Sequence, residues 1–154
     1  AEDFQDKIMK FWRDNSKWDE LMSFINEDME NWGNGRYKKF YFDLMKLKID
    51  EVALMNMMLC SATPVGGTRN AYSKQTLENC YNRYTRKIII ELNPEFVILS
   101  GTVVNNAMKK FKDELLKDLP NTQIINTFHY RPQNPNDWAR ADEDAIHVSK
   151  LLLN

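Results

Sequence analysis

Three short apolar runs, each followed by an amphipathic helix pattern, constrain the fold of this chain most strongly. The runs cover residues 52–59 (VALMNMML), 95–100 (EFVILS) and 122–127 (TQIINT). Continuous apolar runs of this length are typical of parallel strands that are buried on both faces. Strands that alternate with helices indicate parallel pairing through helical crossovers. The sequence therefore predicts an α/β fold, a three-layer α/β/α sandwich with a central parallel sheet.

Apolar residues at helical spacing predict the helices around these strands. Residues 1–31 form a helical N-terminal segment, and a further helical pattern contains Tyr37, Phe40, Tyr41, Leu44 and Leu47. A helix that opens at Ser73 has the inward stripe Leu77, Cys80, Tyr81, Tyr84, Ile88 and Leu92. One helix over residues 102–119 directs Val103, Ala107, Phe111 and Leu115 inward. The last helix is capped by Asn136 and buries Trp138, Ala141, Ala145, Val148 and Leu152.

Length and composition indicate one globular domain over residues 1–154, since 43% of the residues are hydrophobic. The net charge of −1 gives no support for a strong nucleic-acid binder, although a local basic patch is compatible with it. No apolar run approaches the length of a membrane span, and the first residues do not resemble a signal peptide. Two cysteines are too few for a disulfide scaffold, which favours a cytoplasmic setting. We expect a monomer without a metal or cofactor.

The carboxyl ends of parallel strands meet at one edge of a sheet, where ligands bind in open α/β folds. Asn56, Gly101 and His129 lie at or near the ends of the three predicted strands, so we expect them to line one cleft. Asn56 is either a structural amide bonded to a loop or a reader of a nucleobase edge, because a carboxamide offers a donor beside an acceptor. The turn at Gly101-Thr102 favours a phosphate through its backbone N–H groups and the helix dipole.

Several blocks of the chain resemble the uracil-DNA glycosylase superfamily, especially its bacterial and archaeal branches. The blocks are VALMNMMLC, SKQTLENCYNRYTRKIIIELNPEFVILSG and INTFHYRP, in this order, and the resemblance runs from about Trp32 to the C-terminus. It implies a domain that binds single- or double-stranded DNA. Such a domain hydrolyses the N-glycosidic bond of a uracil-like or modified base in base-excision repair, after the base is flipped out of the stack.

The resemblance also implies roles for individual residues. Asn56 would read the base, and His129 would donate a hydrogen bond to the departing base. The expected DNA contacts are Ser61, Thr63, Arg69, Gly101, Thr102, Tyr130 and Arg131. Cys60 and Cys80 occupy positions where some branches place two of four iron–sulfur ligands, but two cysteines cannot hold an ordinary four-cysteine cluster. We therefore expect both to be small buried apolar residues.

Two departures from the family pattern bear on activity. The 154 residues contain no Gly-x-x-Pro turn of the kind that positions the attacking water in the family, and Tyr130 and Arg131 replace the Pro and Ser that follow the family histidine. We therefore expect little or no glycosylase activity from these residues alone. The alternatives are a catalytically silent glycosylase-fold domain that binds DNA or a protein, and a flavodoxin-like or Rossmann-like nucleotide-binding module. The last ranks lowest because the chain has neither G-x-G-x-x-G nor a P-loop.

Overall fold

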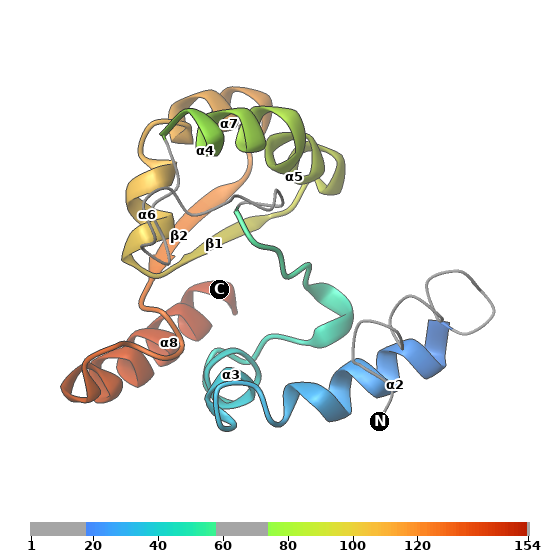
Figure 1. Ribbon diagram of the computed structural model, residues 1–154, viewed down its shortest axis with the longest axis vertical. Coiled ribbons are helices and arrows are strands. Elements are labelled where there is room, and N and C mark those ends of the chain that lie inside the picture. Colours follow the sequence, from blue (N-terminus) through green and yellow to red (C-terminus); the bar gives the residue numbers. More distant parts are fainter. Residues whose placement is uncertain (1–17, 58–73, 154) are drawn as a thin grey trace.

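The structure, a computed structural model, describes residues 18–57 and 74–153 (Figure 1). Before the first gap the elements are α2 (Trp18–Met29), α3 (Arg36–Lys38), the π-helical turn η2 (Lys39–Leu44) and the 3-10 turn η3 (Ile49–Glu51). A second helical stretch contains α4 (Lys74–Cys80), the π-helical turn η5 (Tyr81–Thr85) and α5 (Arg86–Leu92). The remaining elements are β1 (Phe96–Ser100), α6 (Thr102–Met108), α7 (Lys112–Asp118), β2 (Gln123–Thr127), the 3-10 turn η6 (Pro135–Asp137) and α8 (Trp138–Leu152). The chain is therefore a mixed α/β protein.

A small parallel sheet of two strands, β1 and β2, lies at the centre of this arrangement. Phe96 pairs with Gln123 and Ser100 with Thr127, so both strands end at the same edge. The start of β1 is set by Asn93, which ends α5 in the left-handed conformation, and by Pro94, which cannot continue a helix. The two predicted strands at residues 95–100 and 122–127 are thus confirmed, as is their parallel pairing.

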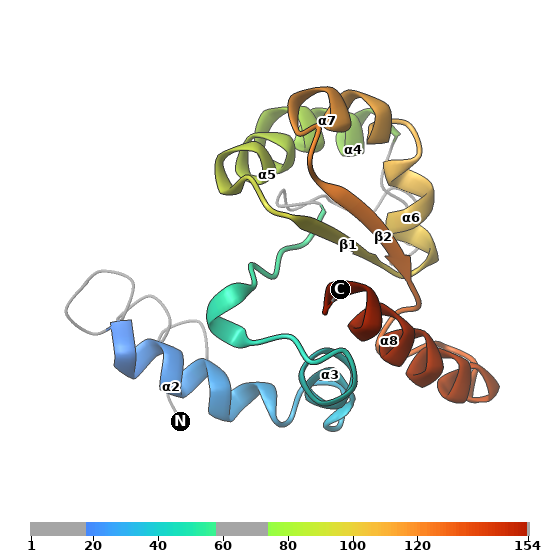
Figure 2. The ribbon, with the colours of Figure 1, turned by 180° about the vertical axis from the view of Figure 1, so that it is seen from behind.

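Helices lie on both sides of the sheet, as two opposite views show (Figures 1 and 2). Helices α4 to α7 gather on one side, while α3 and α8 lie on the other. The strands supply side chains to both, because successive residues of a strand point to opposite faces. Val97 and Ile124 pack with the cluster on the first side, and Ile98 and Ile125 pack with the cluster on the second.

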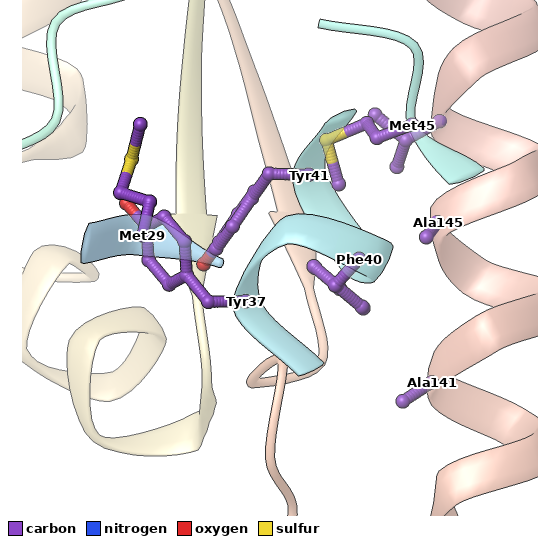
Figure 3. Close-up of a cluster of buried hydrophobic side chains, with 8 residues drawn as sticks. Met29, Tyr37, Phe40, Tyr41, Met45, Ala141 and Ala145 are labelled. Carbon is purple, nitrogen blue, oxygen red and sulfur yellow. The ribbon is translucent and has the colours of Figure 1, made fainter. Parts of the chain in front are cut away.

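In the cluster on the α8 side, residues from the first described part of the chain pack against the last helix. Phe40 and Met45 lie against α8, where Ala141 and Ala145 occupy successive turns of one face (Figure 3). Neither alanine is exposed, and their small side chains allow the π-helical turn η2 to approach α8 closely. Tyr37, Phe40 and Tyr41 are buried at the spacing that the sequence predicts, although a π-helical turn takes the place of a regular α-helix there.

The cluster on the other side is built around Tyr81, whose ring stacks on Phe111 at a centroid distance of 4.0 Å. The ring is fully buried, and the Tyr81 hydroxyl has no hydrogen-bond partner within residues 18–57 and 74–153. Burial raises the pKa of this phenol to about 12, against the opposing effect of the nearby Arg86 charge. Tyr81 therefore acts as a neutral, apolar core ring. Cys80 beside it is buried, as expected, and Cys60 lies outside the described residues.

The strand predicted at residues 52–59 is not formed in its described part. Residues 52–57 follow η3 without regular secondary structure, and the side chains of residues 53–56 are exposed. Residues 58 and 59 lie outside the described residues. Apolar character does not by itself give a strand, because backbone N–H and C=O groups also need a neighbouring chain to pair with. Within the described ranges, β1 and β2 pair only with each other.

Four details of the predicted helices are also wrong. Residues 102–119 form two helices instead of one, and Val103 is 83% exposed while Met108 takes the inward position. Tyr84, Ile88 and Leu92 lie on the surface, because the buried side of η5 and α5 carries Tyr81, Thr85 and Ile89. In the last helix, Ala141, Ala145 and Val148 are buried as predicted, whereas Trp138 is exposed. The predicted cap Asn136 lies instead in the 3-10 turn η6, where the Asn134 side chain accepts from the Asn136 amide, and Asp137 at the start of α8 makes no side-chain cap bond.

Candidate functional site

The shared edge of β1 and β2 brings Gly101 next to His129. Gly101 follows β1 with a φ of 94°, and a Cβ placed on it would lie 3.2 Å from the His129 Cβ. Glycine tolerates this positive φ, and it also leaves room for the imidazole to approach the backbone. The close approach confirms part of the predicted arrangement, since these two residues meet at the carboxyl ends of neighbouring strands.

The imidazole of His129 is exposed and its Nδ1 is engaged locally. The Arg131 amide donates to Nδ1 at 3.1 Å, and the Arg131 carbonyl oxygen also lies 3.1 Å from this atom. When Nδ1 accepts from the amide, the neutral ring carries its proton on Nε2. The Nε2–H is then a donor without a hydrogen-bond partner among the described residues, which suits a carbonyl or anionic oxygen of a ligand.

Asp144 on α8 holds the start of the His129 loop. One carboxylate oxygen, Oδ2, accepts from the Thr127 hydroxyl and, at 2.8 Å, from the Phe128 amide. Two donors on one carboxylate oxygen fix the direction in which the chain leaves β2. The sequence gives a weak signal for this role, because Asp144 lies on the polar side of an amphipathic helix like any surface carboxylate.

A second polar contact links the edge of the sheet to η2. The Tyr41 hydroxyl is 2.6 Å from Ser100 Oγ, and Ser100 donates to the Phe128 carbonyl oxygen at 3.2 Å. Burial raises the pKa of Tyr41, the Ser100 hydrogen bond opposes the rise, and the neighbouring Tyr130 adds to it. Tyr41 is thus a neutral donor that orients the Ser100 hydroxyl toward the backbone.

Asn105 on α6 is a polar residue that the sequence patterns do not single out. Its side-chain amide lies 3.5 Å from the Thr127 carbonyl oxygen, which also accepts the Gly101 amide at 2.9 Å. The Asn105 Oδ1 is buried and has no hydrogen-bond partner in the part of the chain that the structure describes. A buried carbonyl oxygen without a donor is costly, and this one lies one helical turn after Gly101, whose carbonyl oxygen accepts from the Asn105 backbone amide.

The Gly101 amide is not available to a phosphate, contrary to expectation. Because it donates to the Thr127 carbonyl oxygen, it extends the ladder of the sheet by one residue. Thr102, at the first position of α6, is exposed. Ser61, Thr63 and Arg69 lie outside the described residues.

The Tyr130 side chain packs into the protein and not outward from the loop. Its ring lies 5.1 Å from that of Tyr37, edge to face, and reaches within 2.7 Å of a Cβ placed on Gly33. Arg36 donates to the Tyr130 carbonyl oxygen at 3.3 Å. Arg131, by contrast, is exposed in the same loop, as His129 is.

Asn56 lies on the exposed segment that replaces the expected strand. No hydrogen bond between described residues joins it to Gly101 or His129. His147 is exposed on α8. Within the basic stretch at residues 36–39, Arg36 is buried and forms an ion pair with Asp142. The distance of 106 residues between these partners explains why no local pattern reveals the pair.

Two surface hollows belong to other parts of the molecule. One is lined by Glu27, Glu30, Lys38, Phe42 and Ile49, and the other by Asn79, Asn82 and Arg83. No group of three metal-ligating side chains is assembled within residues 18–57 and 74–153. In the same ranges, no helix is both long and apolar enough to span a membrane. The polar edge around His129 therefore remains the candidate site.

Comparison with known proteins gives no relative for this chain: no family model, no curated protein and no solved structure matches it. The class that the structure itself defines is a mixed α/β protein with a small parallel sheet.

Proposed function

We propose that this chain is a uracil-DNA glycosylase-like domain, folded as a three-layer α/β/α sandwich, that binds DNA through the edge around His129. One observation carries the proposal: His129 is exposed at the carboxyl edge of two parallel strands and is packed against Gly101, with its Nδ1 engaged by its own loop. The order of the sequence blocks that resemble the family adds support, as do the helices on both faces of the sheet. The low cysteine count supports a cytoplasmic setting.

The chemistry that this edge offers is the stabilisation of a leaving group. Cleavage of an N-glycosidic bond leaves negative charge on the departing base, and the Nε2–H of His129 would donate to its carbonyl oxygen. A preorganised donor of this kind typically lowers a barrier by about 3–4 kcal/mol. Asp144, which fixes the strand end, would position the histidine without contacting the base.

A second candidate is a catalytically silent binding domain. It is favoured because several groups expected to contact the DNA or the base are not available at this edge. Asn56 is exposed and outside the sheet, the Gly101 amide is already bonded, and Tyr130 is packed inward. The 154 residues also contain no Gly-x-x-Pro turn. General acid–base groups typically contribute about 10²–10⁴-fold to a rate. We therefore expect residues 1–154 to bind DNA while excising a base slowly or not at all.

The test combines binding with single-turnover cleavage. Fluorescence anisotropy measures the affinity of residues 1–154 for single- and double-stranded oligonucleotides that contain either uracil or thymine. Arg131→Ala should weaken binding, while the matched change of an exposed cation elsewhere, Lys117→Ala on α7, should leave it unchanged. Cleavage is then followed on the uracil oligonucleotides with and without His129→Ala.

The outcomes separate the two candidates. Binding without cleavage supports a silent domain, whereas cleavage abolished by His129→Ala supports an enzyme. Rapid cleavage, at the rate of an intact glycosylase, would show that the chain holds a water-positioning group that the sequence does not reveal. Absence of both binding and cleavage, in protein whose circular dichroism shows it to be folded, rejects the proposal.

A further inference from the structure

The surface of η5 and α5 carries an apolar row that the fold leaves in solvent. Tyr84, Ile88 and Leu92 are 44%, 39% and 52% exposed. They are four residues apart, so they form one row about 12 Å long at the helical rise of about 1.5 Å per residue. The core side of the same helical stretch is separate and consists of Tyr81, Thr85 and Ile89. The helical stretch therefore has apolar side chains on two faces. One face is buried in the core, and the other is exposed.

A row of charges runs beside the apolar row and changes sign along it. Arg83, Lys87 and Glu91 each precede a member of the apolar row by one residue, and all three are exposed. None of them takes part in an ion pair among the described residues. The row is basic at its N-terminal half and acidic at its C-terminal half, and Glu95 follows just beyond the helix.

We propose that this surface binds a second copy of the chain, with the two helices antiparallel. A two-fold axis close to Ile88 would place the apolar rows against each other, since the same patch serves both partners in a symmetric dimer. In this orientation Lys87 faces Glu91 of the partner subunit, and Glu91 faces Lys87 of the partner subunit. In a parallel two-fold pair the two charge rows would lie on opposite sides of the contact, so they would not pair with each other. The charge order is therefore complementary between two copies of the chain in the antiparallel direction.

The expected association is weak. Three partly exposed apolar side chains per copy provide a contact well below the roughly 800 Å² per partner of a standard interface. Such small contacts belong to transient complexes, so we expect dimers to become populated only above about 100 µM. This inference replaces the monomer expected from the sequence, and it does not depend on the proposed function because the row lies apart from the residues of the His129 edge.

The test is a charge exchange followed by sedimentation velocity over a range of protein concentrations. Lys87→Glu gives a copy with two acids at positions 87 and 91, and Glu91→Lys gives a copy with two bases. Each variant alone should remain monomeric at concentrations where the unmodified chain forms dimers. An equimolar mixture should form a heterodimer, because the acids of one copy then face the bases of the other. Ile88→Ser should abolish dimers by removing the centre of the apolar row.

Controls separate this surface from general charge effects. Lys109→Glu and Glu143→Lys change exposed charges outside the helix that contains α5, and the dimer should survive both. Circular dichroism verifies that every variant is folded. The proposal is overturned if the unmodified chain stays monomeric at about 1 mM, where even millimolar affinities are detectable. It is overturned equally if each charge variant alone still forms dimers, or if the equimolar mixture of the two variants does not.

Discussion

The ion pair between Arg36 and Asp142 provides the sharpest test of how this fold is held together. Arg36 Nη1 and Nη2 lie 3.2 Å and 2.6 Å from the two Asp142 carboxylate oxygens, which is a bidentate geometry. The side chains are only 10% and 24% exposed. Arg36 also donates to the Tyr130 carbonyl oxygen, and its guanidinium lies 5.2 Å from the Trp138 ring centroid. One side chain thus joins α3 to α8 and to the loop that carries His129.

The size of the effect follows from what each substitution leaves behind. Asp142→Ala leaves a largely buried guanidinium without its carboxylate, and breaking such a pair typically costs about 3–5 kcal/mol. We take the lower end, about 3 kcal/mol, because both groups keep some contact with water. Arg36→Ala should cost about 2–3 kcal/mol, since Asp142 retains Lys39 at 2.8 Å while three hydrogen bonds are lost.

The assay is a double-mutant cycle measured by urea unfolding, with circular dichroism and tryptophan fluorescence as probes. The double variant should be less destabilised than the sum of the single variants by about 1.5–2 kcal/mol, because the pair is lost only once. Lys39→Ala is the matched control. Its side chain is 48% exposed, and a pair of that kind is worth about 0.2–1 kcal/mol. A coupling energy near zero would refute the reasoning, since it would mean that the two charges do not stabilise each other in solution.

The same pair predicts a dependence on pH. Burial alone would raise the pKa of Asp142, but the hydrogen bonds from Arg36 and Lys39 and their positive charges hold this pKa below its usual value. The carboxyl therefore binds a proton less readily in the folded chain than in the unfolded chain, where its pKa is about 3.9. The resulting stability is present above that value and is lost as the pH falls through the lower, folded pKa. The Asp142→Ala variant should lose less stability than the unmodified chain over this acid range.

Two further predictions concern the core and the sheet edge. Phe40→Ala should cost about 3–5 kcal/mol in unfolding free energy, because the ring is fully buried, whereas Val103→Ala should cost less than about 0.5 kcal/mol at an 83% exposed site; equal costs in urea unfolding would contradict the arrangement. Asp144→Ala leaves the Thr127 hydroxyl and the Phe128 amide without their acceptor, at about 1–3 kcal/mol. Hydrogen exchange of the Phe128 amide should accelerate in this variant, while exchange of the Phe40 amide stays slow when the two proteins are compared at equal global stability. Unchanged exchange of the Phe128 amide would contradict the anchoring role of Asp144.

The sequence by itself determines the elements whose signals are local. The parallel pair β1 and β2 is predictable because each is an apolar run of a few residues between helix signals, and Asn93-Pro94 marks where α5 ends. Ala141, Ala145 and Val148 are predictable for the same reason, since a spacing of three and four residues defines one helix face. The meeting of Gly101 and His129 follows once the two strands are known to be parallel neighbours.

Tertiary structure decides what depends on partners far along the chain. Residues 52–57 have a strand-like composition, but a strand needs a neighbour, and the sequence does not state whether one is present. The π-helical turn η5 and the packing around it decide that Thr85 and Ile89 face inward while Tyr84, Ile88 and Leu92 face solvent. Arg36 becomes a structural residue because α8 packs beside α3 and η2 and brings Asp142 within reach. Asp144 becomes one because α8 also packs along β2, where it meets Thr127 and Phe128.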